Sequence, residues 1–413
     1  MKLKKIFSKA ALLWSSVSAG IFLIGYNIGT GSITTMAAAG AEYGMTLTWA
    51  LLLSCLFTYC LIIAFSRYTM VTGRTVLDSF RRSFGAPVTL FILASMLVAE
   101  LTSSMGLMGV ATEVVAEWSR PLTADGEGFD RLAIALVFAL LLGWCSLRGR
   151  QAFFEKILSL FVFLMGISFL ATFFVVTPSP AAILGGLKPS IPDHGNAFMI
   201  VSGMVGTTMG AILFIVRSIL VRDKGWTIGD MRIQRRDALV SVGLMFVLSF
   251  AIMACAAGAM PGEKIENAIQ MVRLIEPLAG DIATSLFVAG IVAAALSSLF
   301  PILLLAPWLL ADYRGRRCDM RSRETRLLIF AGLLCSLAVP LFGGRPVSVM
   351  ILSQTMAVIA TPLILLFMTI LLNRRSLMGS HRPAPWQNLL YALVTLFTAV
   401  MAVLGIAGIG RLF

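Results

Sequence analysis

The chain contains about eleven long apolar segments separated by short polar loops. A helix of about 20 apolar residues spans the hydrocarbon core of a bilayer, and inside that core its backbone groups bond within the helix. These constraints predict an all-α polytopic membrane protein with one transmembrane domain over residues 1–413. The predicted spans cover residues 12–39, 45–67, 87–118, 132–147, 153–176, 197–221, 238–260, 282–310, 326–342, 347–372 and 389–409.

The composition excludes several other classes of protein. Charged residues make up 13% of the chain, about half the fraction typical of soluble domains. The net charge of +13 does not indicate nucleic-acid binding, because the Lys and Arg residues lie in short loops between spans. The six cysteines form no C-x-x-C motif and both histidines lie in loops. The sequence therefore predicts no metal cluster, no cofactor and no enzymatic activity.

The basic residues fall in alternate loops, which fixes the expected orientation. They occupy the N-terminal segment and the loops around residues 74–82, 148–150, 222–236, 314–326 and 374–375. The positive-inside rule then places the N-terminus in the cytoplasm and, with an odd number of spans, Phe413 outside. We expect a bacterial-type inner membrane, with the lipid bilayer and an ion or small-molecule substrate as partners. The sequence indicates no oligomeric state.

Two of the spans are interrupted by glycine. Residues 25–32 (Gly-Tyr-Asn-Ile-Gly-Thr-Gly-Ser) interrupt the first span and residues 205–210 (Val-Gly-Thr-Thr-Met-Gly) interrupt the sixth. Glycine disfavours a helix interior, and paired interruptions in corresponding halves predict the substrate site of an inverted-repeat transporter. The two repeats would cover residues 12–177 and 196–373, followed by an extra helix at 389–409. A packing seam of small residues is the alternative interpretation.

The interrupted segments resemble a known family. Gly29-Thr30-Gly31-Ser32, followed by Ala-Gly-Ala-Glu-Tyr-Gly at residues 39–44, is similar to the first helix of the Nramp (natural resistance-associated macrophage protein) divalent metal transporters. Gly206-Thr207-Thr208, and Ser353-Gln354 with Pro362, resemble the sixth and tenth helices of that family. The resemblance implies a LeuT-like fold of five plus five helices, in which helices 1 and 6 are broken. It also implies a secondary transporter that works by alternating access.

The chain departs from the family at the metal ligands. Gly29 stands where the family has a metal-binding aspartate, and Gly210 stands where it has a methionine. Ile212 replaces the histidine that follows that methionine, and Ala360 replaces a polar residue of the tenth helix. The third-helix glutamate is retained as Glu100. We therefore expect no metal site with the family's usual ligands.

The interruptions and the resemblance together predict the site residues. The expected substrate-binding residues are Gly29, Thr30, Gly31, Ser32, Thr207, Thr208, Gly210 and Gln354. Glu100, a carboxylate inside an apolar span, is a candidate for coupling, with a hydrogen-bonded structural acid as the alternative. Arg217 is a candidate for gating, although snorkelling to the interface is the favoured interpretation. Asp312 is expected only to cap a helix end.

These residues constrain the cargo. Hydroxyl and carbonyl oxygens alone do not replace the hydration shell of a dication, and the soft ligand that selects Mn²⁺ or Fe²⁺ is missing. The predicted cargo is therefore a divalent cation that keeps its water, like Mg²⁺. A transporter of a small neutral or zwitterionic solute is one alternative. A non-transporting scaffold with a degenerate site is the other.

Overall fold

The computed structural model describes residues 30–148, 151–176, 178–274 and 283–411, and all regular elements in these ranges are helices. The longer helices are α2 (Thr30–Tyr43), α3 (Thr48–Thr72), α5 (Ala86–Ser119), α6 (Arg131–Arg148), α7 (Gln151–Val176), α9 (Ala197–Met209), α10 (Ala211–Asp223), α11 (Met231–Ala259), α13 (Ala283–Tyr313), α14 (Arg323–Ser336), α16 (Pro346–Ile359), α17 (Thr361–Asn373) and α19 (Pro385–Gly410). The shorter ones are α4 (Val76–Phe84), α8 (Pro180–Gly185), α15 (Ala338–Phe342) and α18 (Arg375–Met378).

The helices match the predicted spans. Within the described residues, 8 helices are long and apolar enough to cross a membrane, and two shorter apolar helices lie at Arg131–Ser146 and Val162–Val176. Together they correspond to the second to eleventh predicted spans. The first predicted span is described only from Thr30 onward, as α2. The expectation of an all-α polytopic membrane protein is confirmed.

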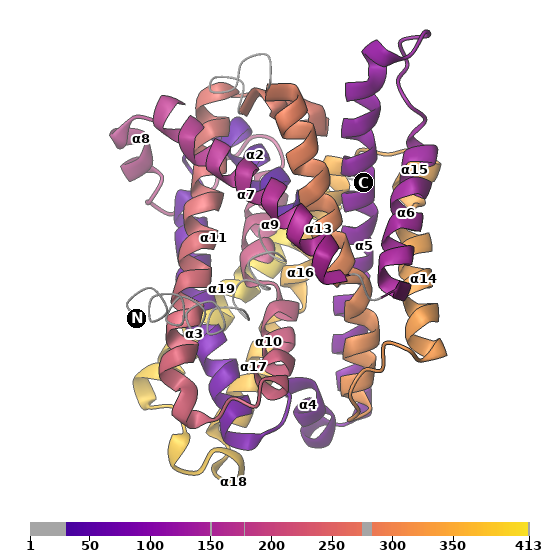
Figure 1. The fold of residues 1–413 in the computed structure, drawn as a ribbon. Helices are drawn as coiled ribbons and strands as arrows, with labels where there is room; N and C mark the ends of the chain where they lie inside the picture. Colours follow the sequence, from indigo (N-terminus) through magenta and orange to yellow (C-terminus); the bar gives the residue numbers. More distant parts are fainter. Residues whose placement is uncertain (1–29, 149–150, 177, 275–282, 412–413) are drawn as a thin grey trace, which may run out of the picture.

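The interrupted helices lie inside the bundle. In Figure 1, α9, α10 and α16 occupy the middle, α3, α11 and α19 lie to one side, and α5, α6 and α14 lie to the other. α2 packs against α9 and α11, and α16 packs against α5 and α9. α13 packs against α5 and α7. The two halves of the sixth span are therefore surrounded by other helices, and its most apolar window is 100% buried.

Three boundaries differ from the prediction. The ninth span, predicted as one helix, is divided at Leu337 into α14 and α15. The tenth span, predicted as one helix, is divided at Ala360 into α16 and α17. Pro362 lies in the first turn of α17, where its missing N–H and fixed φ are tolerated. The charged stretch at 222–237 was predicted as a loop, but α11 begins at Met231, because its Gln234 and Asp237 have buried polar partners.

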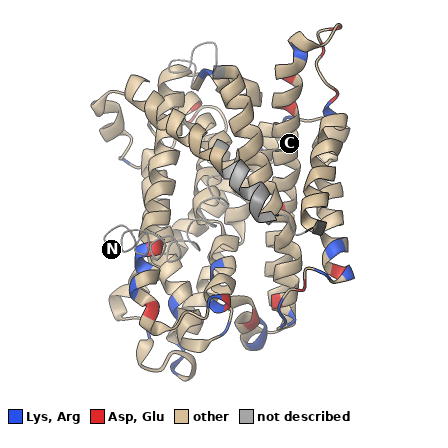
Figure 2. Cartoon of the chain, in the orientation of Figure 1, with Lys and Arg blue, Asp and Glu red and all other residues tan. Residues whose placement is uncertain are grey.

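Charged residues gather at the two ends of the bundle. Figure 2 shows a tan middle, with most of the blue ribbon at the end that carries α4 and the last turn of α10. We call this the basic end. Basic side chains in helix-connecting segments there include Arg74, Arg314, Arg316, Arg317 and Arg321. This distribution is the one that the positive-inside rule describes for a single face of a membrane.

Candidate functional site

The sixth span is broken at Gly210. α9 ends at Met209, and Gly210 has φ −54° and ψ 132°, so the backbone is extended for one residue before α10 begins. The break agrees with the predicted interruption at residues 205–210. The last carbonyls of α9 and the first N–H groups of α10 lack partners within their own helices. One of these carbonyls, on Thr208, accepts a hydrogen bond of 2.9 Å from Thr58 Oγ1.

The two predicted interruptions meet in space. Ser32 Oγ in the first turn of α2 lies 2.8 Å from Thr207 Oγ1 in the last turn of α9, within hydrogen-bonding distance, although 175 residues separate them. Gly29 lies outside the described residues, so the first interruption is seen only from Thr30 onward. The contact joins the two spans in which the sequence predicted interruptions.

A cavity of about 40 Å³ lies where α2, α5, α9, α10, α13 and α16 converge. Six of the predicted site residues line it, namely Gly31, Ser32, Glu100, Thr207, Gly210 and Gln354. The other lining residues are Ala99, Ser103, Leu107, Gly206, Ile212, Leu213, Ser298, Ile302, Met350, Ser353 and Ala357. The sequence therefore predicted lining residues on four of the six helices that form this cavity, and Gly210 at the break between α9 and α10.

Thr30 and Thr208 lie beside the cavity without lining it. Both side chains are buried. The Thr208 hydroxyl donates to the carbonyl of Met204 at 3.0 Å, which is a common arrangement for threonine inside a helix. Neither residue contributes to the cavity surface.

The glycines at the interruptions allow α16 to approach. A Cβ atom at Gly31 would lie 2.8 Å from Nε2 of Gln354, and one at Gly206 would lie 1.8 Å from the Gln354 carbonyl oxygen. Glycine at residue 31 therefore leaves room for the Gln354 side chain where it lies. Glycine at residue 206 leaves room for the Gln354 backbone. Small residues allow close helix approach in membranes, and here that approach places the Gln354 amide in the cavity wall.

The polar lining of the cavity is mostly neutral. Glu100 is buried on α5 and is the one carboxylate among the lining residues of the described chain, with Ser103 about one turn further along the same helix. Hydroxyl and amide groups make up the rest of the polar side-chain lining. All of these are hard ligands of the kind that Mg²⁺ and Ca²⁺ accept. Met350 contributes a thioether to the same wall, which the sequence had not indicated.

Three lining serines were not predicted as site residues. Ser103, Ser298 and Ser353 lie on α5, α13 and α16. Ser298 Oγ is buried and finds no hydrogen-bond partner within the described residues, whereas its neighbour Ser297 donates to the carbonyl of Ala294 at 3.0 Å. Serine is so common in membrane helices that the sequence alone does not distinguish the one that faces the cavity.

Arg217 lies away from the cavity and does not snorkel. Its side chain is 1% exposed and forms an ion pair with Asp237 of α11, which is 0% exposed. Its Nη2 also donates to Gln234 Oε1 at 2.6 Å, and Gln234 Nε2 donates to Ser66 Oγ at 2.7 Å. The favoured interpretation from the sequence was therefore wrong. A buried acid on α11 holds this guanidinium inside the protein.

Comparison with models of protein families shows which family the chain belongs to. The sequence model of the natural resistance-associated macrophage protein-like family (Nramp) matches residues 20–408. The chain belongs to the Nramp family. The divalent metal cation transporter MntH of Deinococcus radiodurans is 25% identical over 360 residues, which cover 85% of this chain and 80% of that protein. The chain is thus an Nramp-family membrane transporter rather than an enzyme.

Solved structures show the same fold. A crystal structure of the Eremococcus coleocola manganese transporter, bound to an aromatic bis-isothiourea substituted compound, has a TM-score of 0.75 at 14% identity and covers 97% of this chain and 87% of its own. The closed conformation of the nucleobase-cation-symport-1 family transporter Mhp1 has a TM-score of 0.58 at 13% identity and covers 95% and 90%. The predicted LeuT-like inverted-repeat fold is confirmed.

Proposed function

We propose that this Nramp-family transporter moves a divalent cation that keeps part of its hydration shell, as Mg²⁺ does. The cation would enter the cavity between the two interrupted spans. Ser32, Thr207, Gln354 and Glu100 would contact it or its waters. The repeats predicted at residues 12–177 and 196–373 would move against each other to expose the cavity to each side of the membrane in turn.

The ligand chemistry of the cavity supports this cargo. Apart from the Met350 thioether, the polar lining offers hydroxyls, one amide and one carboxylate. Mg²⁺ is usually held through one or two carboxylates and retained waters. In the family's usual site a methionine favours softer ions, and Gly210 stands at that position here. A single carboxylate also leaves the bound dication only partly neutralised, which favours release.

The volume of the cavity favours a hydrated divalent cation over an organic solute as the cargo. A water molecule needs roughly 10–15 Å³ of such space, so the cavity of about 40 Å³ holds an ion with a few waters. An amino acid would require the surrounding helices to separate. Transport of a small neutral or zwitterionic solute therefore remains the alternative.

We further propose an orientation in a bacterial inner membrane. The basic end would face the cytoplasm, because the positive-inside rule places such loops there. The N-terminus would then be cytoplasmic and the C-terminus would lie on the outer face. The C-terminal end of α19 and the start of α9 lie together, since Asn196 Nδ2 donates to the Gly408 carbonyl at 3.0 Å.

Uptake into proteoliposomes tests the cargo. Purified protein should take up Mg²⁺ with saturation and should show no micromolar saturation with Mn²⁺. Glu100→Gln should lower kcat/KM for Mg²⁺ by about tenfold or more, because a hydrogen bond or ligand contact from a charged group contributes roughly 1.5–3 kcal/mol. Glu117→Gln is the matched control on the same helix, since Glu117 pairs with Arg120 outside the cavity.

Other outcomes would contradict the proposal in distinct ways. Micromolar saturation by Mn²⁺ without Mg²⁺ uptake would show that the hydrated-ion interpretation is wrong. Saturable uptake of an amino acid would favour the organic-solute alternative. If neither Mg²⁺, Mn²⁺ nor an amino acid is taken up, the result would favour a non-transporting scaffold.

A further inference from the structure

α10 connects the cavity to the basic end. Its first turns carry Ile212 and Leu213 of the cavity lining, and its last turns carry Ser218 and Arg222. A helix of 13 residues is about 20 Å long and behaves as a rod over that length. Whatever holds its last turn therefore also restrains the cavity wall at its first turn.

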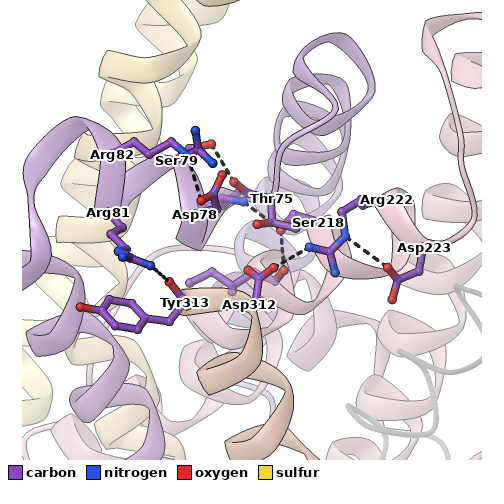
Figure 3. A network of polar contacts seen from close by, with 12 residues as sticks. Thr75, Asp78, Ser79, Arg81, Arg82, Ser218, Arg222, Asp223, Asp312 and Tyr313 are labelled. Carbon is purple, nitrogen blue, oxygen red and sulfur yellow. Dashed lines mark hydrogen bonds and ion pairs between the residues drawn. The ribbon is translucent and has the colours of Figure 1, made fainter. Parts of the chain in front are cut away.

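An ion pair holds the last turn of α10 to α13. Arg222 Nη1 lies 2.7 Å from Asp312 Oδ1, and the Asp312 side chain is 2% exposed. Figure 3 shows this pair at the centre of a polar network. Asp312 was expected only to cap a helix end. The structure instead places its carboxylate against a guanidinium from a helix 90 residues earlier in the chain.

The short helix α4 contacts both partners of this junction. The backbone N–H of Val76 donates to Ser218 Oγ on α10 at 3.2 Å. Arg81 Nη1 donates to the carbonyl of Tyr313 at the end of α13 at 2.6 Å, and the guanidinium lies 5.0 Å from the centre of the Tyr313 ring. Three elements thus meet around Arg222 and Asp312 (Figure 3).

The Arg222 pair differs from the deeper Arg217–Asp237 pair. Both members of the deeper pair are buried, so separating them leaves a charge without solvent or partner. Arg222 is 25% exposed and also contacts the half-exposed Asp223 at 3.2 Å. Its guanidinium therefore keeps water and an anionic partner when it leaves Asp312. The Asp312 carboxylate is 2% exposed and loses its guanidinium partner when the pair opens. This pair leaves one buried charge unpaired, whereas the Arg217–Asp237 pair leaves two, so the Arg222–Asp312 pair costs less to open.

We propose that Arg222 and Asp312 are positioning residues whose ion pair latches α10 in the conformation seen here, closing the cavity toward the basic end. Opening the pair lets α10 tilt about Gly210 and connects the cavity to that side. The inference rests on the proposed transport function, because a latch has a role only where the cavity opens and closes.

The latch is tested by the reactivity of a cysteine placed in the cavity wall. Ala357→Cys serves as the reporter, in a full-length chain whose native cysteines are replaced by alanine or serine, namely Cys55, Cys60, Cys145, Cys255, Cys318 and Cys335. Cys318 lies in the loop between α13 and α14, close in the sequence to Asp312. Partial burial raises the pKa of its thiol and so lowers its reactivity, but Cys318 is replaced with the other five so that only the reporter reacts. A membrane-impermeant maleimide is applied from the side that carries α4, and the alkylation rate is measured.

Opening the latch should expose the reporter. Arg222→Ala and the nearly isosteric Asp312→Asn should each raise the alkylation rate about tenfold, equivalent to about 1.4 kcal/mol of closed-state stabilisation. Arg222→Lys keeps the charge and should stay near the parent rate. Asp78→Ala is the matched control, because it breaks the Arg82–Asp78 pair within α4, whose arginine is 60% exposed, and should leave the rate unchanged.

The result that overturns the proposal is a parent-like alkylation rate in both Arg222→Ala and Asp312→Asn, provided that the variants elute as monodisperse protein. An equal rise in Asp78→Ala also overturns it, since that would show general loosening of this end. The readout needs no cargo. If the latch variants behave as expected but no divalent cation is transported, the proposed cargo fails and the latch stands.

Discussion

At the scale of single residues, Gly31 decides where the Gln354 amide lies. Gly31→Ala would place a methyl group 2.8 Å from Nε2 of Gln354 and 3.1 Å from Cε of Met350. We expect the amide to be displaced from the cavity, which should raise KM for the cation roughly tenfold, the effect of losing about 1.4 kcal/mol of binding. Proteoliposome uptake at varied Mg²⁺ concentration measures this.

Gly243→Ala is the matched control for that substitution. Gly243 lies inside α11, and a Cβ atom there would have no neighbour within 4 Å. Alanine should therefore keep uptake and stabilise the helix by up to about 1 kcal/mol. Equal KM values for Gly31→Ala and the parent would show that Gln354 does not contact the cargo.

Ser298 allows a binding role to be separated from a structural one. Its hydroxyl is buried without a partner in the described chain, and removing an unpaired polar group is nearly neutral or stabilising. Ser298→Ala should therefore keep the thermal unfolding temperature in detergent while weakening cation uptake severalfold, as expected for about 1 kcal/mol lost with one ligand oxygen. Ser297→Ala, one residue away, should leave uptake unchanged. Uptake unaltered in both variants would remove Ser298 from the site.

At the scale of elements, the Arg217–Asp237 pair joins α10 to α11. Asp237→Leu leaves the Arg217 guanidinium buried without its acid, which should destabilise the protein by roughly 3–5 kcal/mol. The double variant Arg217→Met with Asp237→Leu should recover most of this loss, because apolar pairs of similar volume replace buried ion pairs well. Thermal unfolding in detergent measures both. A double variant as unstable as the single one would show that Asp237 acts through other contacts.

The elements also show which features the sequence could predict. Long apolar runs determine the spans, and two glycines in one short stretch indicated the break at Gly210. The break at Ala360 was missed because it has only Pro362 as a signal, and proline also occurs inside helices such as α13. Gln234 and Asp237 resembled loop residues, because hydropathy does not reveal that a polar side chain has a buried partner. Ser298 was not predicted as a site residue because hydropathy also does not reveal which serine hydroxyl faces a cavity.

At the scale of the whole molecule, α19 is long and apolar enough to cross a membrane, and its two ends contact different helices. Its start contacts the end of α3, where Arg67 Nη1 donates to Gln387 Oε1 at 3.2 Å. Its end contacts the start of α9 through Asn196 and Gly408. Three predicted spans separate the basic loop at residues 314–326 from Phe413, so the two should lie on opposite sides of the membrane.

Reporter fusions test this arrangement. Alkaline phosphatase, which folds in oxidising compartments, should be active when fused after Phe413 and inactive when fused after Met320, and green fluorescent protein should give the reverse pattern. Fusions at both sites distinguish an error in the orientation from an error in the number of spans. The reversed pattern at both sites would mean an inverted orientation with the span count intact. The same pattern at both sites would mean an even number of spans between them, which would contradict the assignment of α14 with α15, α16 with α17, and α19 as three crossings.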